Sequence, residues 1–449
     1  MVRDLLERAT VPEPPIGPIT QNALRAGIRL RRRRVQGIAA AAAVICAAAF
    51  VVTETTVNRS ATPAAEPATV YVLGMTQNAD TVTPIPTTTN RPGRPIVLES
   101  AVSGTGTQLA VTPNGKTIWV ADGNAVTPIS ATTHTAGTLV RLASQRHGNF
   151  IQQLLITPDG KTLYVLDSTG RTGSLTAISP ATHRPGRPIE LGQAGAAGEM
   201  AITPNGKTLY VAVPGTPTSY VIPIALATGR PGKRITVPAN VADIVVTPDG
   251  KTLYVISMTL AARSSQIEVT PIATATNRPD RPIIAGNGLL GVDVQAVMSP
   301  DGQTIFIPDA LPSGVIPFST ATNTPGKLIS LGAGQVRAIT VAPDGSTAYV
   351  LSQPTGRLQR PHTTRGLLGL TCTGPPGDVT PITTATNTVR RPIKVGCSPY
   401  VAAFTPDGRT LYVGGLSASV TPITTATGRP GKPIKVDLPE AILIVPAPG

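Results

Sequence analysis

The chain has 449 residues and a formal net charge of +14, yet only 14% of its residues are charged and 3% are aromatic. It contains 46 prolines and 44 glycines, and 41% of its residues are hydrophobic. This composition excludes an intrinsically disordered chain, because enough apolar surface is present to form a large core.

The N-terminal part of the sequence predicts a membrane anchor. Residues 1–34 form a polar tail that ends in an arginine block, Arg31–Arg34, and no charged residue occurs from Val35 to Thr53. A span of this length is sufficient to cross a bilayer as a helix. The positive-inside rule then places residues 1–34 in the cytoplasm and the rest of the chain outside. We therefore expect a single-pass membrane protein with a transmembrane signal-anchor helix at 35–53 and a linker at 54–69; secretion after signal cleavage is the alternative.

A nine-residue motif organises the rest of the chain. Its clearest copy is Thr157–Val165, with the sequence TPDGKTLYV, and its turn glycine recurs every 43 to 63 residues. Seven copies occur, at 112–120, 157–165, 203–211, 247–255, 299–307, 342–350 and 405–413. Pro-Asp-Gly suits a tight turn in which glycine adopts the left-handed conformation. Each copy therefore predicts a hairpin between two apolar strands.

A second motif alternates with the first. Its last copy reads VTPI at 420–423, followed by Ala426-Thr427, then Arg429-Pro430-Gly431 and a short apolar run, and equivalents begin at Val82, Val126, Leu175, Val221, Val269, Val315 and Val379. Pro-Gly favours a type II turn, with glycine at positive φ. We therefore expect a third and a fourth strand joined at Arg-Pro-Gly. Four short strands in roughly 40–50 residues are typical of a propeller blade.

The two ends of the repeat region complement each other. Val70–Leu73 resembles a second strand that lacks its first, and Ala441–Val445 resembles a first strand that lacks its second. Pairing them would complete a blade and close the ring without exposing a sheet edge. The sequence therefore predicts an all-β fold over 70–449, a β-propeller of eight four-stranded blades, with seven blades as the alternative.

The motifs TPDGKTLYV, VTPI and Ala-Thr-Asn resemble those of the YVTN-type β-propeller repeat family. The resemblance covers residues 70–449, and it implies a propeller fold. Members similar to this chain are often extracytoplasmic surface or periplasmic proteins without an assigned chemistry. Because related propellers include lactone hydrolases, the resemblance alone does not determine the function.

Aligned first strands share a position five residues before the turn proline. It is occupied by polar residues in five repeats and by Ala338 and Val401 in two others. Because innermost strands surround the propeller axis, we expect these polar side chains at the mouth of a central channel, where they either bind a cation or small polar molecule or only contact water. The candidates are Gln108, Gln153, Glu199, Asp243 and Gln295.

The loops that connect the second to the third strand, or one blade to the next, vary in length and are expected on the face opposite the turns. Such loops are where binding sites usually occur. Two of them carry histidine near arginine: Arg146 with His147, and Arg360 with His362. Cys372 and Cys397 fall on this face of one blade, outside the cytosol, and predict a disulfide. Free thiols are the alternative.

The positive charge follows the Arg-Pro-Gly segments. It serves either to bind an anionic wall polymer or lipid headgroups, or only to keep exposed turns soluble. Nucleic acid is not expected, because no basic helix or aromatic stacking surface accompanies the charge. The partners that we expect are a cell-envelope protein or an anionic wall polymer, and we expect the propeller to be a monomer.

No nucleophile elbow, nucleotide-binding glycine motif or metal-ligand spacing occurs in the sequence, so we predict no catalytic residue, no metal and no cofactor. The sequence favours a membrane-tethered, non-catalytic binding or scaffold module at the cell surface. The alternative is a lactonase-like hydrolase that uses Glu199 and Asp243 at the channel mouth. Such acid–base chemistry would require two neighbouring carboxylates, one of them with a raised pKa.

Overall fold

The computed structural model describes residues 67–446, except for 77–78, 100–107, 123–124, 143–149, 169–171, 194–197, 216–217, 239, 261–264, 289, 291–294, 311–312, 333 and 355–374. Within this part of the chain every regular element is a β-strand, so no helix that could cross a membrane is present there. The predicted tail (1–34), membrane span (35–53) and most of the linker lie outside the described residues. Their assignment stays a prediction.

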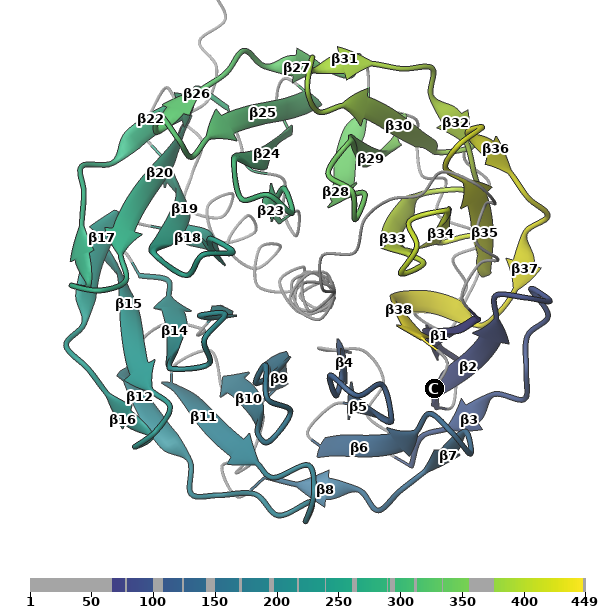
Figure 1. Cartoon of the computed structure of the whole chain (residues 1–449), viewed down its shortest axis with the longest axis horizontal. Helices are drawn as coiled ribbons and strands as arrows, with labels where there is room; N and C mark the ends of the chain where they lie inside the picture. Colours follow the sequence, from purple (N-terminus) through teal and green to yellow (C-terminus); the bar gives the residue numbers. More distant parts are fainter. Residues whose placement is uncertain are drawn as a thin grey trace, which may run out of the picture.

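Eight antiparallel sheets form a closed ring around a central axis (Figure 1), which confirms the predicted eight-bladed propeller. Blade 1 consists of β38 (Leu438–Pro446), β1 (Ala68–Met75), β2 (Asp80–Pro86) and β3 (Ile96–Val97). Blade 2 consists of β4 (Gln108–Val111), β5 (Thr117–Asp122), β6 (Ala125–Ser130), β7 (Thr135–Ala136) and β8 (Val140–Arg141). Blade 3 consists of β9 (Phe150–Ile156), β10 (Leu163–Ser168), β11 (Thr172–Ile178) and β12 (Ile189–Gln193). Blade 4 consists of β13 (Glu199–Ile202), β14 (Thr208–Val213), β15 (Thr218–Ala225), β16 (Arg230–Pro231) and β17 (Ile235–Pro238).

The remaining blades repeat the order from the axis outwards. Blade 5 consists of β18 (Val241–Val246), β19 (Thr252–Leu260), β20 (Ser265–Ala273), β21 (Arg278–Pro279) and β22 (Ile283–Gly286). Blade 6 consists of β23 (Val297–Met298), β24 (Thr304–Ala310), β25 (Ser313–Ser319), β26 (Thr324–Pro325) and β27 (Ile329–Ser330). Blade 7 consists of β28 (Gln335–Val341), β29 (Thr347–Gln353), β30 (Asp378–Thr383), β31 (Thr388–Val389) and β32 (Ile393–Lys394). Blade 8 consists of β33 (Pro399–Phe404), β34 (Thr410–Gly415), β35 (Ser419–Thr424), β36 (Arg429–Pro430) and β37 (Ile434–Lys435).

Ring closure follows the prediction from the two ends of the chain. The C-terminal strand β38 pairs antiparallel with β1, with Leu443 opposite Tyr71, and supplies the innermost strand of blade 1 (Figure 1). Apolar side chains then fill every interface between neighbouring blades, in eight hydrophobic clusters. Most of the blade surface is buried on both sides, which explains why the strands are rich in Val, Ile and Leu without a clean alternation.

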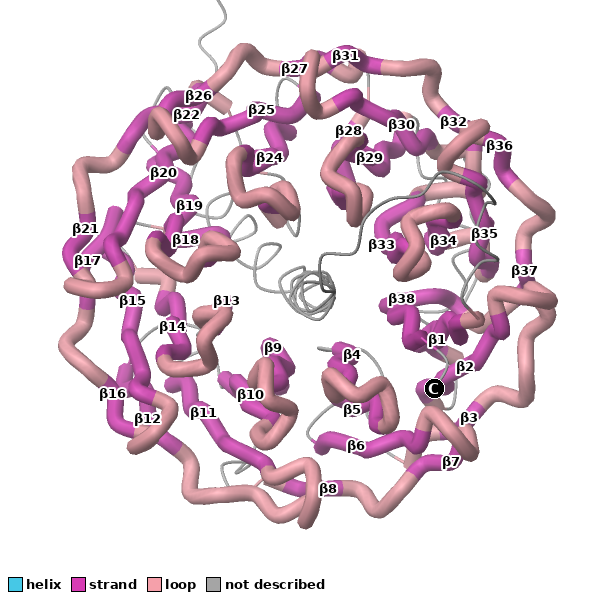
Figure 2. The backbone as a smooth tube through the Cα atoms, viewed as in Figure 1, coloured by secondary structure: helices cyan, strands magenta, loops and turns pink. Residues whose placement is uncertain are grey.

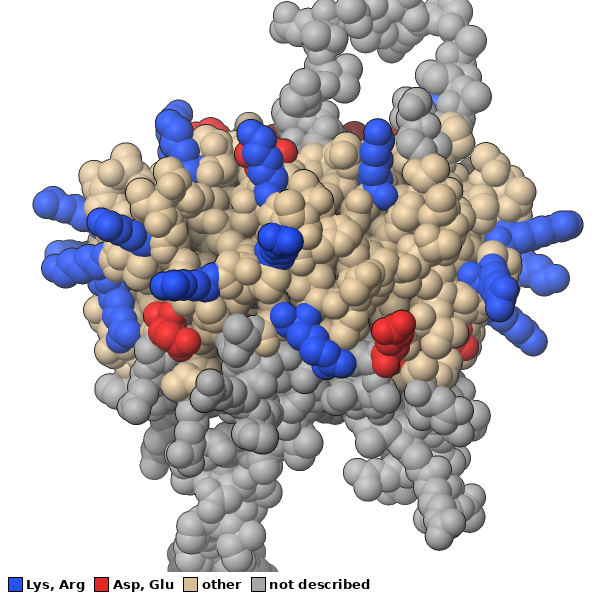
Figure 3. All heavy atoms as spheres, turned by 90° about the horizontal axis from the view of Figure 1, so that it is seen from below, with Lys and Arg blue, Asp and Glu red and all other residues tan. Residues whose placement is uncertain are grey.

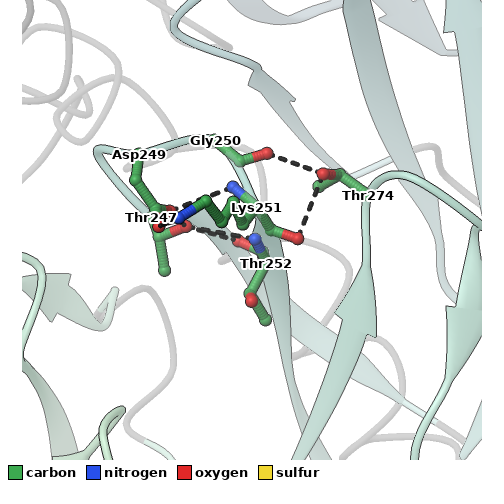
Figure 4. A network of polar contacts seen from close by, with 6 residues as sticks. All are labelled: Thr247, Asp249, Gly250, Lys251, Thr252 and Thr274. Carbon is green, nitrogen blue, oxygen red and sulfur yellow. Dashed lines mark hydrogen bonds and ion pairs between the residues drawn. The ribbon is translucent and has the colours of Figure 1, made fainter.

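The Pro-Asp-Gly hairpin turn forms as the sequence predicts. In all seven copies the glycine has a φ of 65–72°, and its N–H donates to the carbonyl three residues earlier at 2.8 Å. Figure 4 shows the copy in blade 5, where Thr247 Oγ1 donates to Asp249 Oδ1 at 2.6 Å. Thr274, from the turn between the third and fourth strands, donates to Gly250 O at 2.6 Å. The two kinds of turn therefore meet on one face of the ring, the turn face.

The predicted turn at Arg-Pro-Gly is wrong. The chain reverses earlier, at segments such as 425–428, and the residue at positive φ is Gly428, not Gly431. Arg429–Pro430 instead begins the outermost strand, and Gly431 N donates to Pro422 O at 2.7 Å. A Cβ on Gly431 would lie 3.1 Å from Pro422 Cγ, so glycine is needed there for close approach to the proline ring.

Proline in the third strand explains why the fourth strand is divided. Pro422 lies in the middle of β35 opposite Tyr412, and its nitrogen has no hydrogen to donate. In an antiparallel ladder the nitrogen and carbonyl of a residue point the same way, and the carbonyl of Pro422 points to the outer strand. The outer strand therefore pairs only on either side of the proline, as β36 and β37. Figure 2 shows these short outer segments running along the circumference.

Candidate functional site

Four of the five predicted channel-mouth residues lie on the innermost strands, as expected, but they are buried; the fifth, Gln295, precedes β23 and is half-buried. The exposed fraction is 0% for Gln108, 3% for Gln153, 7% for Glu199 and 4% for Asp243. In blades 3 and 5 this position directly follows a β-bulge. Because a bulge re-aims the residues beside it, each side chain can turn towards the neighbouring blade.

Three of these side chains bond to the backbone of the next blade. Gln108 Oε1 accepts from Leu154 N at 2.7 Å, and Gln153 Oε1 accepts from Met200 N at 2.5 Å. Asp243 Oδ2 accepts from Ala296 N at 2.8 Å. An innermost strand is a sheet edge, so its inward N–H groups have no partner within the blade. The polar side chains supply that partner, a role that the sequence analysis did not anticipate.

Two contacts depart from this pattern. Asp243 Oδ1 accepts from its own neighbour Ile244 N at 2.8 Å, while Gln295 Nε2 of blade 6 donates to Glu199 Oε2 of blade 4 at 3.2 Å. Glu199, Asp243 and Gln295 therefore belong to one region of the ring. Burial raises the pKa of Asp243 to about 7, although the two backbone hydrogen bonds act in the opposite direction.

The eighth member of this ring of positions is Ala441, which the sequence alignment could not place because β38 has no turn. A bulge separates the Leu73–Ala441 pair from the Gly74–Pro439 pair, so Ala441 stands where Gln153 stands in blade 3. Gln108, Gln153, Glu199, Asp243 and Gln295 form a polar arc over blades 2 to 6. Ala338, Val401 and Ala441 form an apolar arc over blades 7, 8 and 1.

The remaining predicted site residues lie mostly outside the described part of the chain. Arg146, His147, Arg360, His362 and Cys372 are among the residues that the structure does not describe. Cys397 is buried and disulfide-bonded, with a partner outside the described residues, so its pairing with Cys372 stays a prediction. The binding roles assigned to the polar arc and to the loop residues likewise stay predictions. The connection between β19 and β20 is short, because their hairpin pairs as far as Leu260 and Ser265.

A second set of contacts joins the blades near the turn face. The tyrosine of the second strand donates to the positive-φ asparagine of the next blade: Tyr210 to Asn277 and Tyr254 to Asn323, both at 2.8 Å. Tyr412 donates to Asn90 at 2.6 Å, which joins blade 8 to blade 1. We call this contact the tyrosine latch. The sequence analysis missed it, although both residue types recur in the repeat and their shared spacing was a usable signal.

Histidines occupy the asparagine position of the latch in blades 2 and 3. Tyr71 Oη donates to Ala131 O at 3.0 Å and lies 2.9 Å from His134 Nδ1. His183 meets Trp119 edge to face, with ring centroids 5.2 Å apart. These contacts give both histidines a structural role between neighbouring blades. Among the described residues, no group of three His, Cys, Asp or Glu side chains could hold a metal ion.

The circumference carries the charge. The outer strand segments and the turns beside them bear exposed cations on every blade, and we call this surface the cationic rim. Its members are Arg91, Arg94, Arg141, Arg184, Arg187, Arg230, Lys233, Arg234, Arg278, Arg281, Lys327, Arg390, Arg391, Lys394, Arg429, Lys432 and Lys435. Figure 3 shows lysine and arginine side chains projecting from the side of the ring, with few acids between them.

The ion pairs are distributed unevenly between the rim and the turn face. On the turn face Lys161 pairs with Asp159, Lys251 with Asp249 and Arg409 with Asp407. On the rim, Lys394 with Asp378 is the one pair among described residues. The cations of the rim are therefore largely uncompensated at short range.

Comparison with known proteins supports the fold and no more. No protein-family model matches this chain, and no curated protein matches it. The structure is similar to that of the dihydro-heme d1 dehydrogenase NirN in complex with DHE, with a TM-score of 0.63 and 15% identity over 88% of this chain and 78% of that one. It is also similar to apo AztD from Citrobacter koseri, with a TM-score of 0.55 and 13% identity over 85% of this chain and 98% of that one. Similarity at these identities shows a shared propeller fold, and the resemblance to the YVTN-type family stays a prediction.

Proposed function

We propose that this protein is a membrane-tethered, extracytoplasmic propeller that binds a partner at the cell surface and has no catalytic activity. The observation that carries the proposal is the engagement of the polar arc. The carboxylate of Asp243 and the amides of Gln108 and Gln153 are buried, and they bond the backbone of the next blade. Groups held in this way are structural, and they do not present a nucleophile or base to a substrate.

The anchoring part of the proposal depends on the sequence of residues 1–53. An arginine block followed by an uncharged span favours a cytoplasmic N-terminus and an outside propeller. The expected partner is a cell-envelope protein or an anionic polymer. A rigid closed ring suits this role, because a preorganised surface binds with a smaller loss of conformational entropy.

The hydrolase alternative is supported by one specific feature, the pKa of Asp243. A carboxyl group with a pKa of about 7 could accept or donate a proton at neutral pH. No described histidine or arginine bonds to Asp243, so the other groups that ester or lactone hydrolysis needs are not provided by the described contacts.

The two functions are separated by one experiment on the full-length chain in detergent. We expect no hydrolysis of a panel of lactones and esters above the background, and retention of a cell-envelope component on the immobilised protein. Protease accessibility of the propeller in intact cells tests its location, and we expect cleavage from outside. Lactone hydrolysis that is lost in Asp243→Asn would contradict the proposal and establish the alternative.

A further inference from the structure

The cationic rim differs from the turn face in its balance of charges. On the turn face three cations pair with an acid two residues earlier in the same turn, as Lys161 does with Asp159, whereas Lys116 and Lys207 follow an asparagine. On the rim the cations recur on every blade, and apart from Lys394 none that the structure describes lies within ion-pair distance of a described carboxylate. A surface of one sign attracts a partner of the opposite sign and raises its association rate.

Protection of the sheet edge does not account for this sign. The outermost strand of each blade is an exposed edge, and prolines such as Pro430, short strand segments and charged side chains all prevent pairing with another sheet. Either sign of charge would serve that purpose. The rim nevertheless carries almost only cations, and few acids such as Glu99 and Glu190 stand among them.

The chemistry of the rim favours phosphate. Most rim cations are arginines, whose planar guanidinium binds a phosphate group through two parallel hydrogen bonds. Two of these guanidinium groups bond to other described residues. Arg234 donates to Leu191 O at 3.1 Å and lies over the ring of Tyr220, and Arg390 donates to Thr383 Oγ1 at 3.0 Å. Within the described part of the chain the other rim arginines make no side-chain hydrogen bond or ion pair.

The geometry of the rim favours a linear partner. The outer segments run along the circumference in an almost continuous path around the ring (Figure 2). A planar membrane could touch only one part of such a curved wall, whereas a flexible polymer can follow it from blade to blade. Several weak contacts along one chain then act together, which raises the overall affinity far above that of a single contact.

We propose that the cationic rim binds a linear phosphate-bearing polymer that lies along the circumference and contacts several blades at once. This inference deepens the binding role proposed above and rests on it. The partner would bind to the side wall of the ring. Its binding would involve neither the polar arc nor the loops on the face opposite the turns.

The test uses the full-length protein in detergent and linear polyphosphate of defined length as the probe. We expect binding that weakens steeply between 50 and about 300 mM salt, and much weaker binding of inorganic phosphate. Neutralising four rim cations should lower the affinity for polyphosphate by roughly tenfold or more. The variant carries Arg184→Gln, Arg187→Gln, Arg278→Gln and Arg281→Gln, all at exposed positions in blades 3 and 5.

The matched control removes the same amount of charge from the turn face. It carries Lys116→Gln, Lys161→Gln, Lys207→Gln and Lys251→Gln, and we expect its affinity for polyphosphate to stay within about twofold of the parent. Equal losses in the rim and turn-face variants would overturn the inference, because binding would then follow net charge alone. A second rim variant, with Arg230→Gln, Lys233→Gln, Arg429→Gln and Lys432→Gln in blades 4 and 8, repeats the test if the first variant unfolds.

Three further probes separate the possible outcomes. Polyglutamate of equal length that binds as tightly as polyphosphate would overturn the preference for phosphate. If vesicles of anionic lipid bound through the rim and polyphosphate did not, the proposal that the partner is a linear polymer would be overturned. Failure of every polyanion to bind would overturn this inference and leave the proposed binding function intact, whereas lactone hydrolysis would contradict that function and leave the rim result unchanged.

Discussion

The polar arc and the apolar arc fill the same eight positions around the axis with different chemistry. In blades 2 to 6 the residue is Gln, Glu or Asp, and in blades 2, 3 and 5 it bonds the backbone of the next blade, as Gln108 does to Leu154. In blades 7, 8 and 1 it is Ala338, Val401 or Ala441, and each of these side chains adds to the apolar packing between two blades. The apolar arc contains the seam where the two ends of the chain meet.

This difference shows that the sequence repeat determines where the innermost strand lies. It does not determine whether that strand contacts the next blade through polar or apolar side chains. Apolar packing at the seam does not depend on protonation, whereas the polar arc includes a carboxyl group with a pKa near neutrality. We therefore expect the two arcs to respond differently to mutation and to pH. Trp119, the one tryptophan in the chain, is fully buried between blades 2 and 3 and reports unfolding by fluorescence.

The largest effect is expected at the seam of the apolar arc. Leu443 has no exposed surface and packs in the cluster between blades 1 and 2. Truncation by Leu443→Ala removes buried methyl groups and leaves a cavity, so it should lower the free energy of unfolding by about 2–5 kcal/mol. Urea denaturation measures the loss, which should be the same at pH 5 and pH 8.

The control for the seam is Val389→Ala on the rim. Val389 is 41% exposed, so its truncation should change the free energy of unfolding by at most about 0.5 kcal/mol. A small cost for Leu443→Ala, similar to that of this control, would show that β38 contributes little to closing the ring.

A smaller and pH-dependent effect is expected in the polar arc. The pKa of Asp243 is raised in the folded state from 3.8 to about 7, so its contribution to stability is fully present below about pH 4 and is lost as the pH rises through 7. Asp243→Asn removes this titration. The variant should therefore be more stable relative to the parent at pH 8 than at pH 5, as measured by urea denaturation at both values.

Glu199 provides the comparison for Asp243, because it lies in the same arc and accepts from Gln295 at 3.2 Å. Parallel stability curves for the parent and Asp243→Asn from pH 4 to 8 would contradict the assignment of the titrating group to Asp243. If Glu199→Gln alone removed the dependence on pH, Glu199 would be the group that titrates.

The sequence predicts features that form within one blade better than contacts between two blades. The turn at Pro-Asp-Gly and the closure by β38 follow from local turn chemistry and from matching the two incomplete ends. The role of Gly431 is not predicted correctly, because a glycine can be required either for a positive φ or for close approach of another residue. Only the position of Pro422 in the folded sheet shows that close approach is the reason at Gly431. The burial of the polar arc could not be predicted either, because it depends on contacts with the next blade, such as that of Gln108 Oε1 with Leu154 N.

The smallest effect tests the tyrosine latch at a place where it is missing. Tyr164 of blade 3 faces the turn of blade 4, where the positive-φ residue is Gly229 and no latch can form. Gly229→Asn should add the hydrogen bond that Tyr210 makes to Asn277, because asparagine tolerates φ near 65° and a Cβ at Gly229 meets only Ile189 Cδ1 at 3.8 Å. We expect a gain of about 1 kcal/mol in the free energy of unfolding.

Two variants separate this hydrogen bond from a backbone effect. Gly229→Ala provides no acceptor and strains the left-handed position, so it should lower the stability by about 1 kcal/mol. Adding Tyr164→Phe to the Gly229→Asn variant should abolish the gain, because the donor is then absent. If the gain persisted without the tyrosine hydroxyl, it would arise from the unfolded chain, and the tyrosine latch would not be what holds neighbouring blades together near the turn face.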